Sequence, residues 1–461
     1  MLFSSHRRGS APIQNREPKI PNSMHRRRFI KTLAATGAAA AAIPQILRAQ
    51  PAARAAANSR LAIGVIGTGG QGLNIMGQAL ASPLAQVVAV CDVDSTHAEN
   101  GRARVEKAYS ENSPTGAWRG CAVYRDYREL LARPDIDAVL IGSPDHWHAL
   151  HTIHAARAGK HIFCEKPAAT TLDESRAMIN AVARAGVACQ IGSMQRSWAE
   201  FQRAIALARG GYLGKITSVK VGLPAGATLP KNPDAPRPQP VPPELDYELW
   251  LGPAPYRPYF EQGTHYFWRH NFAFSGGRLT DWIGHHHDIA MLATGVENQL
   301  PVAIRNARAT FIEGRALFNT AWTYNFDAHY ANGTVINLCD KNRLGVTIEG
   351  TEGTIHVTRG RITHSTSLLE RVIIPPWKNP LARGVRGHMD NFIDCALHGG
   401  EPRCPVISSH AAVGAGILAN AAFRSGRASL DIDLKTERAI NAPDANAFLK
   451  KVYRAPWAFP A

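Results

Sequence analysis

The stretch Leu61-Ala-Ile-Gly-Val-Ile-Gly-Thr-Gly-Gly-Gln-Gly72 determines the fold of this 461-residue chain. Residues 61–66 form a short, nearly all-apolar run, which is typical of a strand buried on both faces. A Gly-x-Gly-x-x-Gly spacing follows, and the sequence predicts a helix over Leu73–Ala81 directly after it. A helix that begins there directs backbone N–H groups and the positive end of its dipole at a pyrophosphate. The expected cofactor contacts of this turn are Gly67, Gly69, Gly70 and Gly72.

An acidic residue in the expected place favours a dinucleotide site over the alternative that the glycines only make a tight turn. A second apolar run, Val87–Cys91, ends at Asp92, twenty residues after Gly72. A carboxylate at that spacing suits the ribose 2′-OH of the cofactor. No arginine follows immediately to bind a 2′-phosphate, so the sequence favours NAD over NADP.

The alternation of strands and helices continues beyond this acid. Helices are predicted over 95–109 and 127–131, and buried strands over Asp137–Ile141 and His161–Cys164. Parallel strands joined by helical crossovers bind ligands at their carboxyl ends. We therefore expect the residues that follow these two strands to lie beside the cofactor. They are Ser143, Pro144, His148, Glu165 and Lys166.

Five motifs together resemble one known family. They are Gly67–Gly72, Ser143-Pro-Asp-His-Trp-His148, Ala158-Gly-Lys160, Glu165-Lys-Pro167 and Thr280-Asp-Trp-Ile-Gly-His-His-His-Asp288. They are spread over most of the chain and make it similar to the Gfo/Idh/MocA oxidoreductases. The resemblance implies an α/β fold, with an N-terminal Rossmann domain over 58–188. The rest, 189–461, would be a C-terminal α/β domain whose open, mainly antiparallel sheet faces the cofactor. In the family this domain often mediates oligomerisation, so a homo-oligomer is expected.

The resemblance also assigns the reacting groups. Oxidation of a sugar hydroxyl requires a base for the O–H proton and a positive group beside the developing alkoxide. The family residues that match Lys166, Asp281 and His285 are catalytic or bind substrate. The alternative for Lys166, a solvated lysine, is disfavoured by the flanking Glu165 and Pro167. Because Asp281 and His285 are four residues apart on a predicted helix, we expect the carboxylate to orient the imidazole and stabilise its protonated form.

The second half of the chain contains a proline-rich loop and an aromatic segment. Eight prolines lie within Pro224–Pro243, which predicts an exposed loop. Sugars stack on aromatic faces, so Tyr266, Trp268 and Arg269 are candidate substrate contacts, with a role in the core or an interface as the alternative. Further strands are predicted over 320–327 and 353–358, and helices over 388–397 and 408–424.

Two histidine clusters resemble metal ligands, but the sequence predicts no metal. The first is His146, His148, His151 and His154, and the second is His285–His287 with Asp288 behind it. Adjacent helical residues point in different directions, and no Cys-x-x-Cys pair supports either cluster. We expect these histidines to line or cap a polar site. The seven cysteines do not form a disulfide framework: Cys91, Cys164 and Cys339 end apolar runs, and only Cys395 and Cys404 could meet.

The N-terminus predicts export. His25-Arg-Arg-Arg-Phe-Ile-Lys31 precedes an alanine-rich run, Thr32–Ile43, in the pattern of a twin-arginine signal, and the residues before Met24 look like an upstream extension. Residues 1–57 would thus be extension and signal, recognised by the twin-arginine machinery and leading to the periplasm. The run is too short for a stable membrane span. The alternative is a disordered basic tail.

The charge balance gives no reason to expect nucleic acid as a partner. Lys plus Arg exceed Asp plus Glu by 52 − 36 = 16, and residues 1–60 hold eleven of these bases and one acid, so the remainder has a surplus of only six. We predict an exported oxidoreductase that holds NAD tightly and acts on a sugar or polyol. The alternatives are an NAD-recycling, glycoside-cleaving enzyme and a non-catalytic sugar-binding module.

Overall fold

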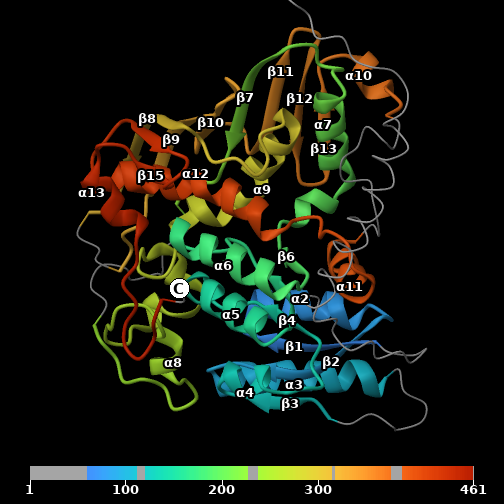
Figure 1. The fold of residues 1–461 in the computed structure, drawn as a ribbon, viewed down its shortest axis with the longest axis vertical. Helices are drawn as coiled ribbons and strands as arrows, with labels where there is room; N and C mark the ends of the chain where they lie inside the picture. The colour runs from blue at the N-terminus through green and yellow to red at the C-terminus, as the bar shows by residue number, and fades with distance from the viewer. Residues whose placement is uncertain (1–59, 112–119, 227–236, 314–316, 375–386, 460–461) are drawn as a thin grey trace, which may run out of the picture. The chain divides into compact units, whose positions relative to one another are not determined.

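The computed structural model describes residues 60–111, 120–226, 237–313, 317–374 and 387–459 (Figure 1). The predicted N-terminal extension and export signal, 1–57, lie outside the described residues, as does the middle of the proline-rich loop, 227–236.

The N-terminal half forms the predicted Rossmann domain. Six parallel strands lie in the order β3-β2-β1-β4-β5-β6. The strands are β1 (Leu61–Ile66), β2 (Ala85–Cys91), β3 (Ala122–Tyr124), β4 (Ala138–Ile141), β5 (His161–Cys164) and β6 (Cys189–Ile191). The helices are α2 (Gly70–Leu80), α3 (Ser95–Ser110), α4 (Tyr127–Leu131), α5 (Asp145–Arg157) and α6 (Leu172–Ala185).

Both faces of this sheet are buried, which explains its nearly continuous apolar strands. On β1, Ile63 and Val65 belong to one core cluster and Ile66 to another. The helix α6 is fixed at its start by a capping box of Thr171 and Glu174 and ends at Gly186 in the left-handed conformation. The chain then enters β6, so the parallel sheet extends past the predicted domain boundary at 188.

The second domain is built on a larger sheet, ordered β13-β12-β11-β7-β10-β9-β8-β14-β15. The strands are β7 (Ile216–Gly222), β8 (Ala303–Thr310), β9 (Thr323–His329), β10 (Val335–Cys339), β11 (Gly345–Gly350), β12 (Gly353–Thr358), β13 (Arg361–His364), β14 (Leu430–Asp433) and β15 (Arg438–Ala439). Every pairing is antiparallel except that of β7 with β10, which confirms the expected mainly antiparallel sheet.

Long helices cover this sheet (Figure 1). They are α7 (Ala199–Arg209), α9 (Gly277–Thr294) and α12 (Val406–Arg424). On β9, Tyr324, Phe326 and Ala328 alternate inward to the shared core. Among the described helices, only α12 is long and apolar enough to cross a membrane, and 94% of its apolar window is buried inside the protein.

The two domains share parts of the chain. The helix α11 (His388–His398) packs Met389, Phe392 and Ile393 into the core of the Rossmann domain, where it contacts β1 and α2. The part of the chain beyond 189 therefore contributes a helix to the N-terminal core. The remaining elements are α8 (Tyr247–Leu251), α10 (Ser367–Arg371), α13 (Pro443–Asn446) and the 3-10 turns η1 (Met194–Ser197), η2 (Glu261–Gly263), η3 (His265–His270) and η5 (Ala447–Leu449).

Candidate active site

The glycine turn brings three backbone segments into contact. Gly67 has a φ of +85°, and a Cβ there would lie 2.6 Å from the backbone nitrogen of Ser143. A Cβ on Gly72 would lie 1.8 Å from the carbonyl oxygen of Gly67, so only glycine permits this helix–strand contact. By contrast, a Cβ on Gly69 or Gly70 would meet no atom within 4 Å. The start of α2 therefore faces open space in which a pyrophosphate can approach the backbone.

One pocket of about 600 Å³ joins the glycine turn to the residues expected at the strand ends. This size is within the usual range for small-molecule sites. Of the residues predicted to contact cofactor or substrate, those that line it are Gly67, Gly69, Gly70, Asp92, Ser143, Pro144, His148, Glu165, Lys166, Tyr266, Trp268 and Arg269. Gly72, Asp281 and His285 do not line it. Gly72 permits close packing of the helix on the strand. Asp281 and His285 lie on α9, behind the side chain of Lys166.

Asp92 lies at one end of the pocket, and its carboxylate already accepts two backbone hydrogen bonds. They come from the N–H groups of Thr68, at 2.7 Å, and Asp94, at 3.0 Å. Asp92 thus holds the glycine turn against the end of β2, and contact with a ribose remains a prediction. Arg125 also lines this end of the pocket, although no arginine follows Asp92 directly in the sequence.

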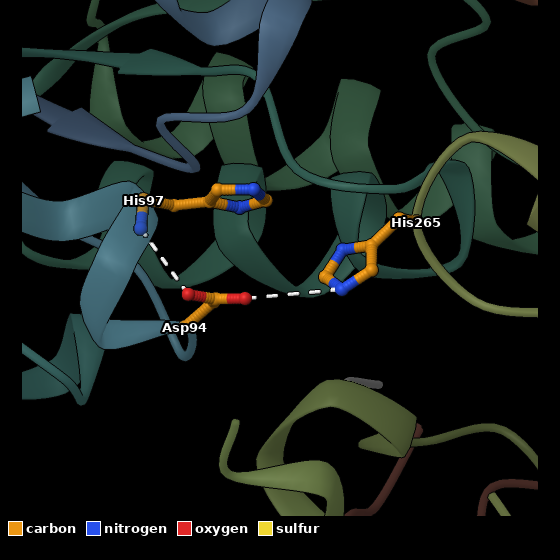
Figure 2. Close-up of side chains that lie close together, drawn as sticks. All are labelled: Asp94, His97 and His265. Atoms are coloured by element: carbon orange, nitrogen blue, oxygen red, sulfur yellow. Dashed lines mark hydrogen bonds and ion pairs between the residues drawn. The ribbon is translucent and has the colours of Figure 1, made fainter. Parts of the chain in front are cut away.

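Asp94, His97 and His265 gather at the same end (Figure 2). Oδ1 of Asp94 caps α3 by accepting the N–H groups of Thr96 and His97, while Oδ2 lies 3.8 Å from Nε2 of His265. One ligand atom from each of the three residues lies within 4.8 Å of the others. These side chains could bind a metal ion or form hydrogen bonds with the ribose hydroxyls of a dinucleotide. In either case the ligand would contact Oδ2 of Asp94, the oxygen that does not cap α3. No local motif indicates this group, because His265 and Asp94 are distant along the chain.

His148 is held by two carbonyl groups. Its Nδ1 lies 2.7 Å from the oxygen of Pro167, and its Nε2 lies 2.8 Å from the oxygen of Ser143. Because carbonyl oxygens only accept, both ring nitrogens must carry a proton for both bonds to form. Burial opposes this charge, but Cys164, Asp145 and the Pro167 carbonyl raise the pKa of His148 to about 10. The imidazolium joins the loop after β4 to the loop that carries Lys166.

The other histidines of the first cluster bind structural partners. Nε2 of His146 lies 3.0 Å from the carbonyl of Trp250, and burial lowers its pKa to about 3. Nδ1 of His151 lies 3.0 Å from the Ser143 hydroxyl, and Nδ1 of His154 lies 2.8 Å from the Tyr127 hydroxyl. His148 and His151 line the pocket, whereas these contacts leave His146 in the core.

Lys166 and Asp281 meet across the two domains. Nζ of Lys166 donates to Oδ1 of Asp281 at 2.5 Å and also lies 3.2 Å from the Asp281 carbonyl. The second oxygen of Asp281 contacts Arg278 at 3.3 Å. Burial would raise the pKa of Asp281, but the charges of Lys166 and Arg269 lower it well below its usual range. Asp281 therefore stays ionised and fixes the ammonium group.

His285 differs from its prediction. No hydrogen bond joins it to Asp281 among the described residues, because Lys166 and Arg278 occupy that carboxylate, and its Nδ1 is buried without a partner. Burial and the charge of Lys166 lower the pKa of His285 well below 6.5. Asp281 favours the protonated form of His285, as expected, but burial and the charge of Lys166 outweigh the carboxylate. His285 is a neutral imidazole.

The rest of the second cluster is structural. His286 contacts the carbonyl of Gly222, and His287 contacts the Ala412 carbonyl and the Tyr330 hydroxyl. Asp288 forms a fully buried ion pair with Arg196. All these groups hold α9 in place.

The candidate substrate contacts are only partly available to a ligand. Tyr266 is 54% exposed, but Trp268 is 7% exposed and belongs to a small core cluster around α8. The guanidinium of Arg269 lies 4.4 Å from the centre of the Trp268 ring and covers it. Arg269 is thus the residue of the three that combines a place in the pocket with a free polar head. All seven cysteines are free, so Cys395 and Cys404 form no disulfide.

Sequence reasoning missed two partners of the Lys166 region. Arg278 contacts Asp281, and its spacing of three residues along α9 could have indicated this. Gln71 donates from its side chain to Glu165 at 2.9 Å, which links the glycine turn to the Lys166 loop. Gln71 occupies a variable position within the glycine motif, so the motif itself gave no signal.

Comparison with known proteins gives matches over most of the chain. The family profile of the Gfo/Idh/MocA oxidoreductases, NAD-binding Rossmann fold, matches residues 61–193. The profile of the C-terminal alpha/beta domain of this oxidoreductase family matches residues 232–459.

Three individual proteins illustrate the likeness. A scyllo-inositol 2-dehydrogenase (NAD(+)) of Bacillus subtilis is 29% identical over 325 residues, which cover 68% of this chain and 82% of that protein. A glycosyl hydrolase family 109 protein of Solibacter usitatus is 32% identical over 123 residues, 27% of this chain and 28% of that protein. The structure of an aldose-aldose oxidoreductase from Caulobacter crescentus, complexed with glycerol, has a TM-score of 0.57 at 22% identity and covers 81% of this chain and 100% of that chain. This last match supports the fold.

Proposed function

Because the chain belongs to the Gfo/Idh/MocA family of oxidoreductases, we propose that it acts, after export, on a hydroxyl group of a sugar or polyol with NAD as cofactor. The observation that carries the proposal is the position of Lys166. It lines the same pocket as the glycine turn, and its ammonium group is fixed by Asp281 at 2.5 Å. A cation held in this way can stabilise the alkoxide that forms as a hydroxyl is oxidised.

The side chains near Lys166 have distinct roles in this proposal. The glycine turn fits a dinucleotide because nothing lies within 4 Å of a Cβ built on Gly69 or Gly70. When bound, the nicotinamide supplies the hydride acceptor. Lys166 donates a hydrogen bond to the substrate oxygen. Neutral His285, behind Lys166, is the proposed acceptor of the hydroxyl proton, and ionised Asp281 keeps the ammonium group oriented.

Export has a consequence for the cofactor. A twin-arginine route carries folded protein, so NAD can be loaded before export, whereas free NAD is expected to be scarce outside the cytoplasm. We therefore propose that the nicotinamide is held tightly and that each hydride taken is returned to a second substrate or to the same one. The carboxylates of Asp92 and Asp94 in the pocket would repel a 2′-phosphate, which favours NAD over NADP.

A second candidate function is cleavage of a glycoside by transient oxidation. The likeness to a glycosyl hydrolase family 109 protein favours it, although the match covers 28% of that protein. Oxidation to a keto sugar would acidify the neighbouring C–H and allow the glycosidic substituent to leave. A third candidate, a sugar-binding module without catalysis, does not account for the fixed Lys166–Asp281 pair.

The functions differ in their products. The purified protein is incubated with a panel of sugars, polyols and glycosides, without and with added NAD or NADP, and the products are identified by mass spectrometry. A keto or lactone product supports the dehydrogenase, and a released substituent supports the glycoside-cleaving enzyme. No product from any compound, with Lys166→Ala indistinguishable from the unmodified protein, contradicts both.

A further inference from the structure

The reacting end of the pocket gathers positive charge around a single carboxylate. Lys166 contacts one oxygen of Asp281 at 2.5 Å, and Arg278 contacts the other at 3.3 Å. Arg269 lines the pocket and acts on Asp281 as well, since its charge helps to lower the pKa of that carboxyl. Three cations thus share one anion.

The neighbouring charged groups do not neutralise this excess of positive charge around Asp281. Glu165 and Asp145 are 3% and 4% exposed, and burial raises the pKa of both carboxyl groups. His148 lies near both carboxylates as a further cation. On the outer side, Arg359 lies over the rings of Trp282 and Trp198 and within electrostatic reach of Asp281. Even without His148, whose raised pKa depends on the charge of Cys164, the four cations Lys166, Arg269, Arg278 and Arg359 outnumber the carboxyl groups of Asp281, Glu165 and Asp145.

The same place has hydrogen-bond donors without acceptors. Nε of Arg278 is buried and unpartnered among the described residues, and its guanidinium group makes only the 3.3 Å contact to Asp281. Arg269 donates to the carbonyl of Tyr266 at 3.2 Å, which leaves most of its five N–H groups free. His270 is 1% exposed, and its Nε2, which donates or accepts according to the tautomer, is unpartnered as well. Such groups are costly to bury unless a ligand or water pairs with them.

We propose that the substrate carries an anionic oxygen group, such as a carboxylate or a phosphate ester, which Arg278 and Arg269 bind beside the reacting hydroxyl. This inference rests on the proposed function and specifies its substrate class. A neutral polyol both donates and accepts hydrogen bonds, and it would find one ionised acceptor among many donors. An anionic group only accepts, and the planar guanidinium groups match its geometry.

The test compares matched neutral and anionic compounds. Binding to the NAD-loaded protein is measured by calorimetry, and oxidation is measured in parallel. The pairs are glucose with glucuronate, galactose with galacturonate, glucose with glucose 6-phosphate, and inositol with inositol monophosphate. The carboxylate and phosphate pairs separate the two sources of the anion. For at least one pair we expect the anionic member to bind about tenfold tighter or more, with the difference reduced at high salt.

Variants identify the residue responsible. Arg278→Gln should weaken binding of the anionic member more than binding of the neutral member, so that the ratio between the two affinities falls, and Arg278→Lys should retain part of the preference. Arg305→Gln is the control, because Arg305 lies on β8 and pairs with Asp431 instead of Asp281. Equal or tighter binding of every neutral member overturns the inference, whatever the turnover. Anion preference in binding without oxidation of any compound supports the inference and contradicts the proposed function.

Discussion

Two buried histidines on either side of Lys166 have opposite surroundings. His148, on the cofactor side, has both ring nitrogens bonded to carbonyl oxygens, and its pKa is raised to about 10. His285, on the substrate side, has an unpartnered Nδ1, and burial and Lys166 lower its pKa. One imidazole is a structural cation, and the other is neutral.

The contrast extends to the whole of each region. On the cofactor side, Asp92 and His148 bond to the backbone and Gln71 bonds to the side chain of Glu165, so the walls are fixed before a ligand arrives. On the substrate side, Arg278, His270 and His285 keep unpaired atoms. The fixed region is suited to binding a cofactor, and the unpaired region is suited to reacting with a substrate.

Removal of the Lys166 ammonium group, which lies between the two regions, should have the largest effect on catalysis. In Lys166→Ala the alkoxide loses its cation, and we expect kcat/KM to fall roughly 10²- to 10⁴-fold while the NAD content changes little. The control is Lys220→Ala, which removes an exposed lysine on β7 that pairs with Glu349. Near-normal turnover of Lys166→Ala would refute the catalytic assignment.

Two glycine substitutions should separate packing from binding on the cofactor side. Gly72→Ala places a Cβ 1.8 Å from the Gly67 carbonyl, and we expect a loss of about 1–3 kcal/mol in the free energy of unfolding, measured with urea. Gly70→Ala meets no atom within 4 Å and should fold normally but bind NAD about tenfold more weakly. If both variants behave alike, the distinction between these two glycines is incorrect.

The contributions of His148 and His285 to the free energy of unfolding should change with pH in opposite directions. The folded pKa of His148 is raised, so its stabilisation is full below pH 6.5 and is lost as pH rises toward about 10. The folded pKa of His285 is lowered, so its neutral form is favoured and stability is lost as pH falls below 6.5. Urea midpoints from pH 5 to 9 for the unmodified protein, His148→Gln and His285→Gln measure this. The deficit of His148→Gln should shrink with rising pH, and His285→Gln should gain relative stability at low pH.

Chelation should have the smallest effect. The reaction proposed for Lys166 and His285 uses no metal, so kcat/KM should be unchanged after treatment with EDTA. Chelation can distinguish the two possibilities, because the side chains of Asp94, His97 and His265 could hold a cation (Figure 2). A loss of activity that added Zn²⁺ restores, and that Asp94→Asn abolishes, would place a metal at the cofactor side instead.

Local sequence pattern predicted the features that depend on neighbouring residues. The glycine turn, the strand ends and the place of Lys166 follow from a short motif and the alternation of strands and helices, and all of them meet in one pocket. The common helix of Asp281 and His285 was also predictable, because both lie within α9.

Features set by distant segments were not predictable. Asp281 pairs with Lys166, which comes from the other domain, and no spacing along α9 could indicate this partner. The charge of His148 depends on where two loops place their carbonyls. The return of α11 to the Rossmann core and the approach of His265 to Asp94 likewise depend on tertiary packing.

The nicotinamide content of the purified protein tests most directly the central claim that NAD is held tightly. The protein is isolated from the compartment in which it accumulates, without added cofactor, and denatured, and the released nicotinamide is measured per chain. A tightly held cofactor that recycles its hydride predicts about one NAD or NADH per chain, with turnover that needs no added NAD. An empty protein that works only with millimolar NAD, and that accumulates NADH in step with product, would contradict it.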